Sequence, residues 1–251
     1  MLANKIAFFD SGVGGLTTLH VAMQQLPNED FIYFGDCLNA PYGVKTTEEI
    51  RNLVFDAVEF LQKHNCKAIV LACNTATSAA VNQLREKYPN LPIVGMEPAV
   101  KLAGKIHDSG RILITATDST LRGQKLNELI HDLNMDDLVD VLSLQELVLF
   151  AEKFEFDSPA LFDYLKLKLE PFNWDEYNSI VLGCTHFNYF KNQLRKFIPE
   201  TVHILDGNQG TVNRLKSLIK EGEGSRQIEF YLSKKADPDY FLPFLKYLDN
   251  Q

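Results

Sequence analysis

Two stretches of the chain carry nearly the same sequence: Ala68-Ile-Val-Leu-Ala-Cys73-Asn-Thr75 and Ser179-Ile-Val-Leu-Gly-Cys184-Thr-His186. Each is a short apolar run followed by a small residue, a cysteine and a polar residue that can cap a helix. Such a run, bounded by turn residues, is typical of a buried strand. Because the stretches lie 111 residues apart, they predict two related α/β lobes, each with a cysteine at a strand-to-helix turn.

Short apolar runs alternate with amphipathic stretches over most of the chain. Ile6–Phe9 and Ile112–Thr115 are apolar runs of strand length, whereas Glu48–His64 has apolar residues at helical spacing. The same spacing predicts helices over Leu121–Leu133 and, after the second cysteine, over Phe187–Ile198. Repeated alternation of strands and helices is typical of parallel sheets flanked by helices.

The strand–helix pattern starts again near Pro98, which divides the chain into two parts. A second crossing is expected near Asp206-Gly207. Residues 1–97 with 207–251 are therefore expected to form the first lobe, and residues 98–206 the second. The predicted fold is α/β, with two similar lobes, each a mostly parallel sheet flanked by helices, and with the active site in the cleft between them.

Composition excludes several classes of protein. The 251 residues carry a formal net charge of −8 without a dense Lys/Arg cluster, so we expect no nucleic-acid partner. No apolar run approaches the roughly 20 residues of a membrane span, so we expect no membrane association. The first residues, MLANKIAFFDSG, lack the pattern of a signal peptide, and we expect a cytoplasmic protein whose four cysteines are reduced.

Three segments are expected to place reactive side chains at the carboxyl ends of strands, where open parallel sheets bind ligands. They are Asp10-Ser11, Cys73-Asn74-Thr75 and Cys184-Thr185-His186. If the two lobes face each other, the two cysteines approach one ligand from opposite sides. That arrangement suits the removal of a proton from one face of a carbon and the return of a proton to the other.

The acid/base requirements of such a reaction fit these residue types. The Cα proton of an amino acid is weakly acidic, and a thiolate at a helix N-terminus is a suitable base. Asp10 or His186 could take the thiol proton. Backbone amides and hydroxyls at the polar positions could hold carboxylates and stabilise the developing charge; these positions are Ser11, Asn74, Thr75 and Thr185.

Each motif also has a purely structural interpretation. Asp10–Gly15 could be a glycine-rich turn for tight packing, Cys73 and Cys184 could be inert core thiols, and His186 could be a hydrogen-bonded structural residue. The match between the two cysteine turns favours catalysis over these interpretations.

The remaining cysteines and a zinc site are further alternatives. Cys37 and Cys66 have no partner motif and are interpreted as structural. Cys184 and His186 with Cys73 could hold zinc, although their spacing matches no common closed zinc pattern. We therefore expect no metal.

Several ordered stretches resemble the glutamate racemases of the aspartate/glutamate racemase family. The stretches are Phe9–Leu16, Tyr33–Asp36 followed by Pro41–Gly43, Ala72–Ala76, Thr117–Thr120 and Gly183–His186. They occur in the family's order and extend over most of the chain. The resemblance implies an isomerase that interconverts L- and D-glutamate without pyridoxal phosphate or another cofactor. It also implies that the enzyme supplies D-glutamate for peptidoglycan, and hence that it acts in cell wall biogenesis and cell shape in the cytoplasm of a bacterium. A homodimer is compatible with the same resemblance.

The resemblance assigns roles to individual residues. Cys73 and Cys184 become the two acid/base thiols, assisted by Asp10 and His186 respectively. Glu152 matches the acidic residue that closes a loop of the second lobe. The substrate pocket positions are Ser11, Pro41, Tyr42, Gly43, Asn74, Thr75, Thr117, Thr120 and Thr185.

The chain departs from the family pattern at two places, and two rival functions stay open. Asn188 stands where the family usually has proline, and Leu142–Glu146 differs from the usual sequence before the acidic residue. One rival is a racemase for aspartate or another acidic amino acid, which would use the same two thiols. The other is a non-catalytic regulatory protein with the racemase fold, for which a thiol pair would be unnecessary.

Overall fold

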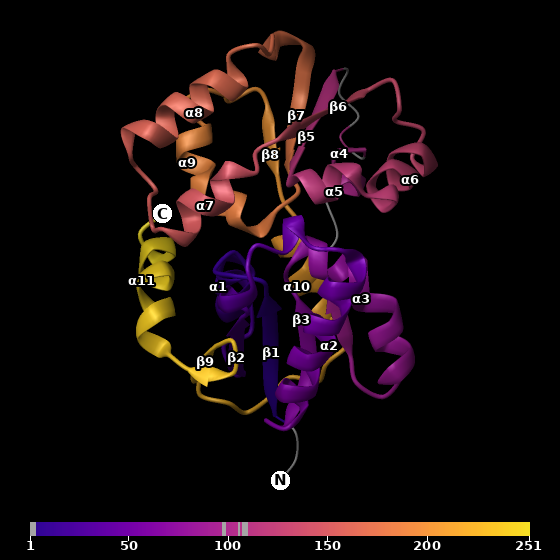
Figure 1. Cartoon of the computed structure of the whole chain (residues 1–251), viewed down its shortest axis with the longest axis vertical. Coiled ribbons are helices and arrows are strands. Elements are labelled where there is room, and N and C mark those ends of the chain that lie inside the picture. Colours follow the sequence, from indigo (N-terminus) through magenta and orange to yellow (C-terminus); the bar gives the residue numbers. More distant parts are fainter. Residues whose placement is uncertain (1–3, 97–98, 105, 107–109) are drawn as a thin grey trace. The chain divides into compact units, whose positions relative to one another are not determined.

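Residues 4–96, 99–104, 106 and 110–251 are described by a computed structural model, in which the chain folds into two units (Figure 1). Unit 1 consists of Met1–Glu97 and Asn208–Gln251, and unit 2 of Pro98–Gly207. The expected first crossing at residues 97 and 98 lies outside the described residues. Each unit is a mostly or wholly parallel sheet flanked by helices, which confirms the predicted α/β class.

Unit 1 is built on a six-stranded sheet with the order β10-β9-β2-β1-β3-β4. All neighbours are parallel except β10, which pairs antiparallel with β9. The strands are β1 (Lys5–Asp10), β2 (Asp30–Gly35), β3 (Cys66–Leu71), β4 (Ile93–Gly95), β9 (Ile228–Leu232) and β10 (Lys235–Ala236). The central strands are buried on both faces, as their continuous apolar runs require.

Helices cover both faces of this sheet. They are α1 (Leu16–Gln25), α2 (Thr47–Gln62), α3 (Asn74–Lys87), α10 (Asn208–Lys216) and α11 (Pro238–Asp249), with short 3-10 turns η1 (Cys37–Asn39) and η2 (Tyr42–Val44). α2 and α3 pack side by side in one core cluster with alternate residues of β1, β2 and β3. α11 covers the opposite face of β2, where its Phe241 ring meets the ring of Tyr33 edge-on with centroids 5.1 Å apart. α1 packs against both α10 and α11.

Unit 2 is built on a four-stranded parallel sheet with the order β6-β5-β7-β8. The strands are β5 (Arg111–Ala116), β6 (Val139–Ser143), β7 (Tyr177–Leu182) and β8 (His203–Leu205). The α-helices are α4 (Val100–Ala103), α5 (Asp118–Arg122), α6 (Gln124–Asp132), α7 (Glu146–Glu152), α8 (Pro159–Leu169) and α9 (Lys191–Leu194), and the 3-10 segments are η3 (Trp174–Glu176) and η4 (Thr185–Phe190).

Two helices differ from the sequence prediction. The helix expected over Leu121–Leu133 is interrupted at Gly123, whose backbone is extended, and becomes α5 and α6. The helix expected over Phe187–Ile198 is a 3-10 segment followed by the short helix α9. All six residues of η4 are buried, whereas an amphipathic α-helix would turn part of its circumference to solvent.

Among the described residues, no helix has both the length and the apolar composition needed to cross a bilayer.

Candidate active site

Cys73 lies between the end of β3 and the start of α3, as predicted. It is the N-cap residue of α3, and its Sγ accepts a hydrogen bond from the amide of Ala76 at 3.4 Å. The side chain is buried, with 7% of the residue exposed. The unpaired amides and the dipole at this helix start favour negative charge on the sulfur. Cys73 is therefore placed where its thiolate is stabilised by the backbone.

Asp10 and Ser11 lie at the carboxyl end of β1, the strand next to β3. The hydroxyl of Ser11 is hydrogen-bonded to Cys73 Sγ at 3.5 Å. The carboxylate of the fully buried Asp10 accepts the amide of Gly12 at 2.9 Å. A side chain at Gly15 would put its Cβ 2.6 Å from that of Asp10, so only glycine lets α1 begin so close to this turn. Asp10-Ser11 and the Cys73 turn thus lie side by side at the carboxyl ends of β1 and β3.

Tyr42 anchors the predicted substrate loop, Pro41–Gly43, in the interior of unit 1. Its hydroxyl donates a 2.6 Å hydrogen bond to Asp36 Oδ2. Burial raises the pKa of Tyr42 above its usual range, and the charges of Asp36, Cys73 and Asp10 raise it further. Because the charges of Cys73 and Asp10 contribute to this pKa, the Tyr42 hydroxyl lies near the Cys73 turn.

Asp36 has a structural role that sequence analysis missed. Its buried carboxylate accepts hydrogen bonds from Tyr42, Asn39 and Ser233. The only signal in the sequence is its place at the end of the Tyr33–Asp36 stretch. The other two pocket positions of unit 1 are the partly buried first residues of α3, Asn74 and Thr75.

Cys184 follows β7 in unit 2, but the local structure differs from that at Cys73. The amide of Gly183 donates to the carbonyl of Thr115 on β5 at 2.7 Å, which fixes the turn against the central strand. The backbone then enters η4, and Cys184 makes no side-chain capping bond. The prediction that Cys184 lies at the start of an α-helix is wrong, because the residues that follow are packed into the core as a 3-10 segment.

Three side chains are joined in series at this turn. Cys184 Sγ lies 3.7 Å from His186 Nδ1, and His186 Nε2 lies 2.7 Å from Glu152 Oε1. Burial alone would lower the pKa of His186, but the hydrogen bonds and charges of Cys184 and Glu152 outweigh it and raise the pKa well above the usual value. The imidazolium is therefore favoured, with one N–H toward the sulfur and the other toward the carboxylate.

The threonine positions of unit 2 lie at the same end of its sheet. Thr117 precedes α5, directly after β5, and its Oγ1 is 3.1 Å from that of Thr120. Thr185 is buried at the start of η4. Hydroxyls and backbone amides thus accompany Cys184 at the carboxyl ends of β5 and β7.

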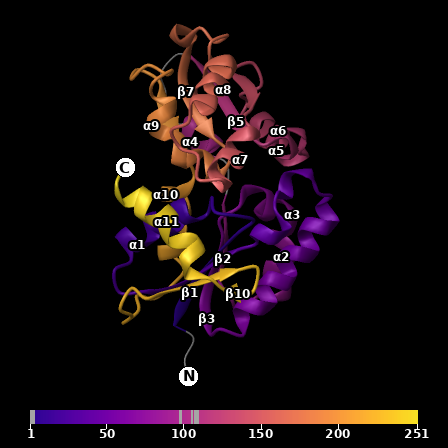
Figure 2. The same cartoon turned by 60° about the vertical axis from the view of Figure 1, so that its left-hand side comes forward.

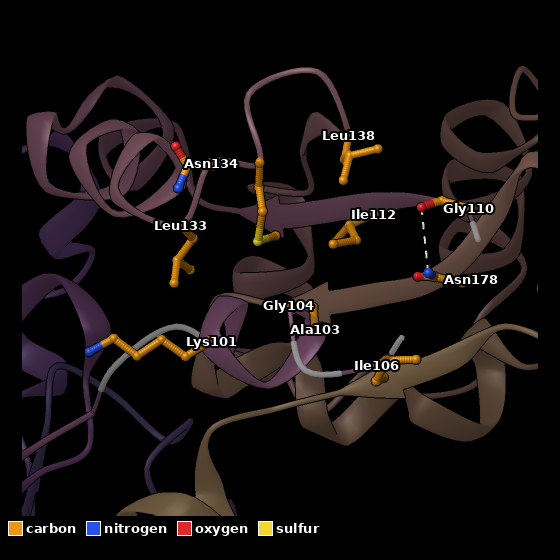
Figure 3. Close-up of a pocket in the computed structure, with 11 residues that line it drawn as sticks. Lys101, Ala103, Gly104, Ile106, Gly110, Ile112, Leu133, Asn134, Leu138 and Asn178 are labelled. Carbon is orange, nitrogen blue, oxygen red and sulfur yellow. Dashed lines mark hydrogen bonds between the residues drawn. The ribbon is translucent and has the colours of Figure 1, made fainter. Parts of the chain in front are cut away.

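Unit 2 also contains a cavity of about 440 Å³ (Figure 3). Ile112, Leu133 and Leu138 supply apolar lining, whereas the side chain of Lys101 extends away from these residues. Gly110 and Asn178, which are hydrogen-bonded to each other at 3.4 Å, place it at the amino ends of β5 and β7. None of the predicted site residues lines this cavity, which lies at the opposite end of the strands from Cys184.

Within the described ranges, no group of three or more His, Cys, Asp or Glu side chains is arranged to hold a metal ion. The expectation of a reaction without metal or cofactor stays a prediction.

Known proteins resemble the chain over nearly its whole length. The family model described as Asp/Glu/Hydantoin racemase matches residues 17–215. A glutamate racemase from Halothermothrix orenii is 48% identical over 239 residues, which cover 93% of this chain and 94% of that protein. One from Campylobacter curvus is 45% identical over 252 residues, covering 98% and 92%.

Solved structures agree with these sequence relatives. The glutamate racemase isoform RacE1 from Bacillus anthracis has a TM-score of 0.86 at 27% identity, covering all of this chain and 96% of that one. The Escherichia coli glutamate racemase in complex with L-glutamate and an activator has a TM-score of 0.85 at 29% identity, covering 97% and 95%. The resemblance seen in the sequence motifs is confirmed, and the chain belongs to the Asp/Glu/hydantoin racemase family.

Proposed function

We propose that the protein is a glutamate racemase that interconverts L- and D-glutamate by proton transfer at Cα between two thiols. The observation that carries the proposal is the pair of cysteine turns. In each unit a cysteine follows a central strand and has a polar partner, Ser11 at Cys73 and His186 at Cys184. Relatives named glutamate racemase, nearly half identical to this chain over most of its length, support the substrate.

The reaction needs a base and an acid on opposite faces of the substrate Cα. In one direction the Cys73 thiolate removes the proton, and the Cys184 thiol donates a proton to the other face. In the reverse direction the two thiols exchange roles. The mechanism therefore requires that both cysteines reach the same substrate molecule. The hydroxyls and amides at the carboxyl ends of the strands would hold the two carboxylates and the developing charge.

The two thiols would be activated by different groups. Asp10 would assist Cys73, which already lies at the start of α3. His186, whose pKa is raised by Cys184 and Glu152 against the effect of burial, would keep a proton available to the sulfur of Cys184. This proton stabilises the thiolate when Cys184 is the base and restores the thiol after it has acted as the acid.

The biological role would follow from the product. D-glutamate is a component of peptidoglycan, so the enzyme would act in cell wall biogenesis in the cytoplasm of a bacterium. A homodimer and the absence of a cofactor are part of the same proposal.

Circular dichroism of the purified protein with L-glutamate, and separately with D-glutamate, tests the function. Because enantiomers have equal free energies, both signals should decay to zero. Prior treatment with a chelator should leave the rates unchanged. In heavy water, product should acquire deuterium at Cα faster than recovered substrate does, as two separate bases require.

The same assay separates the rivals. Decay with aspartate but not with glutamate would identify the other acidic amino acid as substrate. A stable signal with glutamate, aspartate and other amino acids would favour a non-catalytic protein. Equal early labelling of both enantiomers in heavy water would contradict a two-base mechanism.

A further inference from the structure

The turn between β9 and β10 lies beside the carboxyl end of β2, at the edge of the unit 1 sheet (Figure 2). β9 is parallel to β2, with Leu232 opposite Gly35. The next two residues, Ser233 and Lys234, have φ values of 43° and 76° and reverse the chain into β10. This hairpin lies beyond residue 215, where the family match ends.

Ser233 connects the hairpin to the segment that follows β2. Its amide donates to the carbonyl of Gly35 at 2.9 Å. Its hydroxyl donates to Asp36 Oδ1 at 2.8 Å and accepts the amide of Leu38 at 3.1 Å. A serine hydroxyl has one proton to donate, so its orientation is set by these two partners.

Asp36 connects Ser233 to the predicted substrate loop through hydrogen bonds to Ser233 and Tyr42. Only 4% of the residue is exposed, and a buried polar or charged group is costly unless it is hydrogen-bonded. Oδ1 accepts from Ser233, whereas Oδ2 accepts from Tyr42 at 2.6 Å. Asn39 Nδ2 lies 3.0 and 3.1 Å from the two oxygens. The carboxylate is thus held from one side by the hairpin and from the other by the loop.

Tyr42 is connected to this network through its hydroxyl and is held by contacts of its ring and its backbone. Its ring is buried beside Phe9, with centroids 6.3 Å apart, and its hydroxyl proton is donated to Asp36. Its carbonyl accepts the amide of Lys45 at 3.0 Å, which closes the loop. We therefore expect a displacement of Asp36 to shift the backbone on both sides of Tyr42, through Asn39 and through Tyr42 itself.

We propose that Ser233 is a positioning residue for substrate binding, which acts through Asp36 and Tyr42 on the loop Pro41–Gly43. The role in binding rests on the proposed function, because the loop is assigned to the pocket by resemblance. The coupling between hairpin and loop rests on the contacts alone.

The first test compares two neighbouring residues of the same turn. Ser233→Ala removes the hydroxyl and should raise KM for glutamate roughly tenfold, with a smaller change in kcat, since it removes a hydrogen bond to a charged group. Lys234→Gln is the control, because its ammonium pairs with Asp56 on α2, and it should leave KM unchanged. Ser233→Gly removes the hydroxyl without straining the left-handed backbone and should reproduce Ser233→Ala. Equal KM values for all four proteins would overturn the role in binding.

A double-mutant cycle tests the route through Asp36. Tyr42→Phe and Ser233→Ala should each raise KM, and the double variant should raise it by clearly less than the product of the two factors. Residues that act through one network are non-additive, whereas independent sites are additive. A full product would show that the hairpin does not act through Tyr42.

Hydrogen exchange separates this proposal from the function itself. The amides of Asn39, Ala40 and Lys45 donate to backbone carbonyls within the loop segment. They should exchange faster in Ser233→Ala than in Lys234→Gln or the unmodified protein. This outcome would support the coupling even in a protein that proved inactive on glutamate. Unchanged exchange would overturn it even in an active racemase.

Discussion

The two cysteine turns share a sequence pattern but differ in the structure that follows each cysteine. Cys73 is the N-cap of the fourteen-residue helix α3, and its sulfur accepts a backbone amide. Cys184 directly precedes a 3-10 segment without a side-chain capping bond, and its sulfur faces the imidazole of His186. In unit 1 the backbone stabilises a thiolate. In unit 2 the thiolate would be stabilised instead by the imidazolium of His186, which is paired with Glu152.

This difference shows that one sequence pattern can supply the same chemical group to two different environments. The pattern fixes a strand, a turn and a thiol at the carboxyl end of a sheet. It does not fix how the negative charge on sulfur is balanced. The two half-reactions should therefore respond differently to mutation and to pH, which is the basis of the predictions below.

The largest effect is expected from removing either thiol. Cys73→Ala or Cys184→Ala should reduce racemisation in both directions by roughly 10³-fold or more, because each direction needs one thiolate and the opposite thiol. Circular dichroism with each enantiomer measures both directions. Cys66→Ala is the control: it removes a thiol on β3 that donates to the carbonyl of Leu61 and whose pKa is raised by burial to about 12. Substantial activity in either catalytic variant would contradict the two-thiol mechanism.

Substitution of the two assisting residues, Asp10 and His186, should affect the two directions of the reaction differently. His186→Asn should impair the direction in which Cys184 is the base more than the reverse, by roughly 10²-fold in kcat. Asp10→Asn should do the opposite, with compensating changes in KM because the equilibrium is fixed. Separate kcat values for L- and D-glutamate are the measurement. Matched losses in both directions for both variants would show that the assistants do not belong to particular thiols.

Local patterns were sufficient for the strands and for the position of the reactive residues. The runs Ile6–Phe9 and Ile112–Thr115 lie within β1 and β5, and Glu48–His64 overlaps α2 closely. The two strands are continuously buried and α2 is buried on one face, so an apolar run and a helical spacing of apolar residues identify them. The predicted helix Phe187–Ile198 is wrong although its apolar residues have helical spacing, because the polar residues between them in η4 are buried as well.

Contacts between distant segments could not be predicted from such patterns. Asp36 and Ser233 are 197 positions apart, and neither belongs to a periodic run. Glu152 was assigned by resemblance alone, yet its carboxylate lies 2.7 Å from His186. Pairings of this kind depend on the order of the strands in each sheet and on which side chains meet there, which local sequence does not encode.

A smaller effect is expected from Glu152→Gln, which keeps a hydrogen-bond acceptor but removes the charge. Burial already disfavours the His186 imidazolium, and the charge of Glu152 is one of the contributions that raise its pKa. The variant should therefore lower that pKa, and the imidazolium should be lost at a lower pH. The alkaline limb of the pH–rate profile should move to lower pH by about one unit, with roughly tenfold lower activity above it.

The pH–rate profile of Asp10→Asn is the comparison for this shift. Its alkaline limb should stay in place, because Asp10 lies in the other unit and takes no part in the raised pKa of His186. An unmoved limb in Glu152→Gln would show that the ion pair does not control the proton on His186.

The smallest effect is expected from Asn188→Pro, which restores the usual family residue in the irregular turn. Asn188 is buried in η4, and its Nδ2 donates to the carbonyl of Thr185 at 3.2 Å. Its Oδ1 has no hydrogen-bond partner among the described residues. Proline would lose the side-chain bond and would disfavour the helical backbone of Phe187. It would also remove a buried unsatisfied acceptor and lower the entropy of the unfolded chain.

These contributions oppose one another, so the free energy of unfolding should change by no more than about 1 kcal/mol, with racemase activity retained. Urea denaturation measures the change, and Asn188→Ala separates its parts, since alanine loses the side-chain contacts but keeps the amide and the freedom of Phe187. A proline variant much less stable than the alanine variant would show that the Cys184 turn depends on the backbone at this point, through the amide of residue 188 together with the helical conformation of Phe187. The contrast with the regular start of α3 would then depend on the backbone of these two residues.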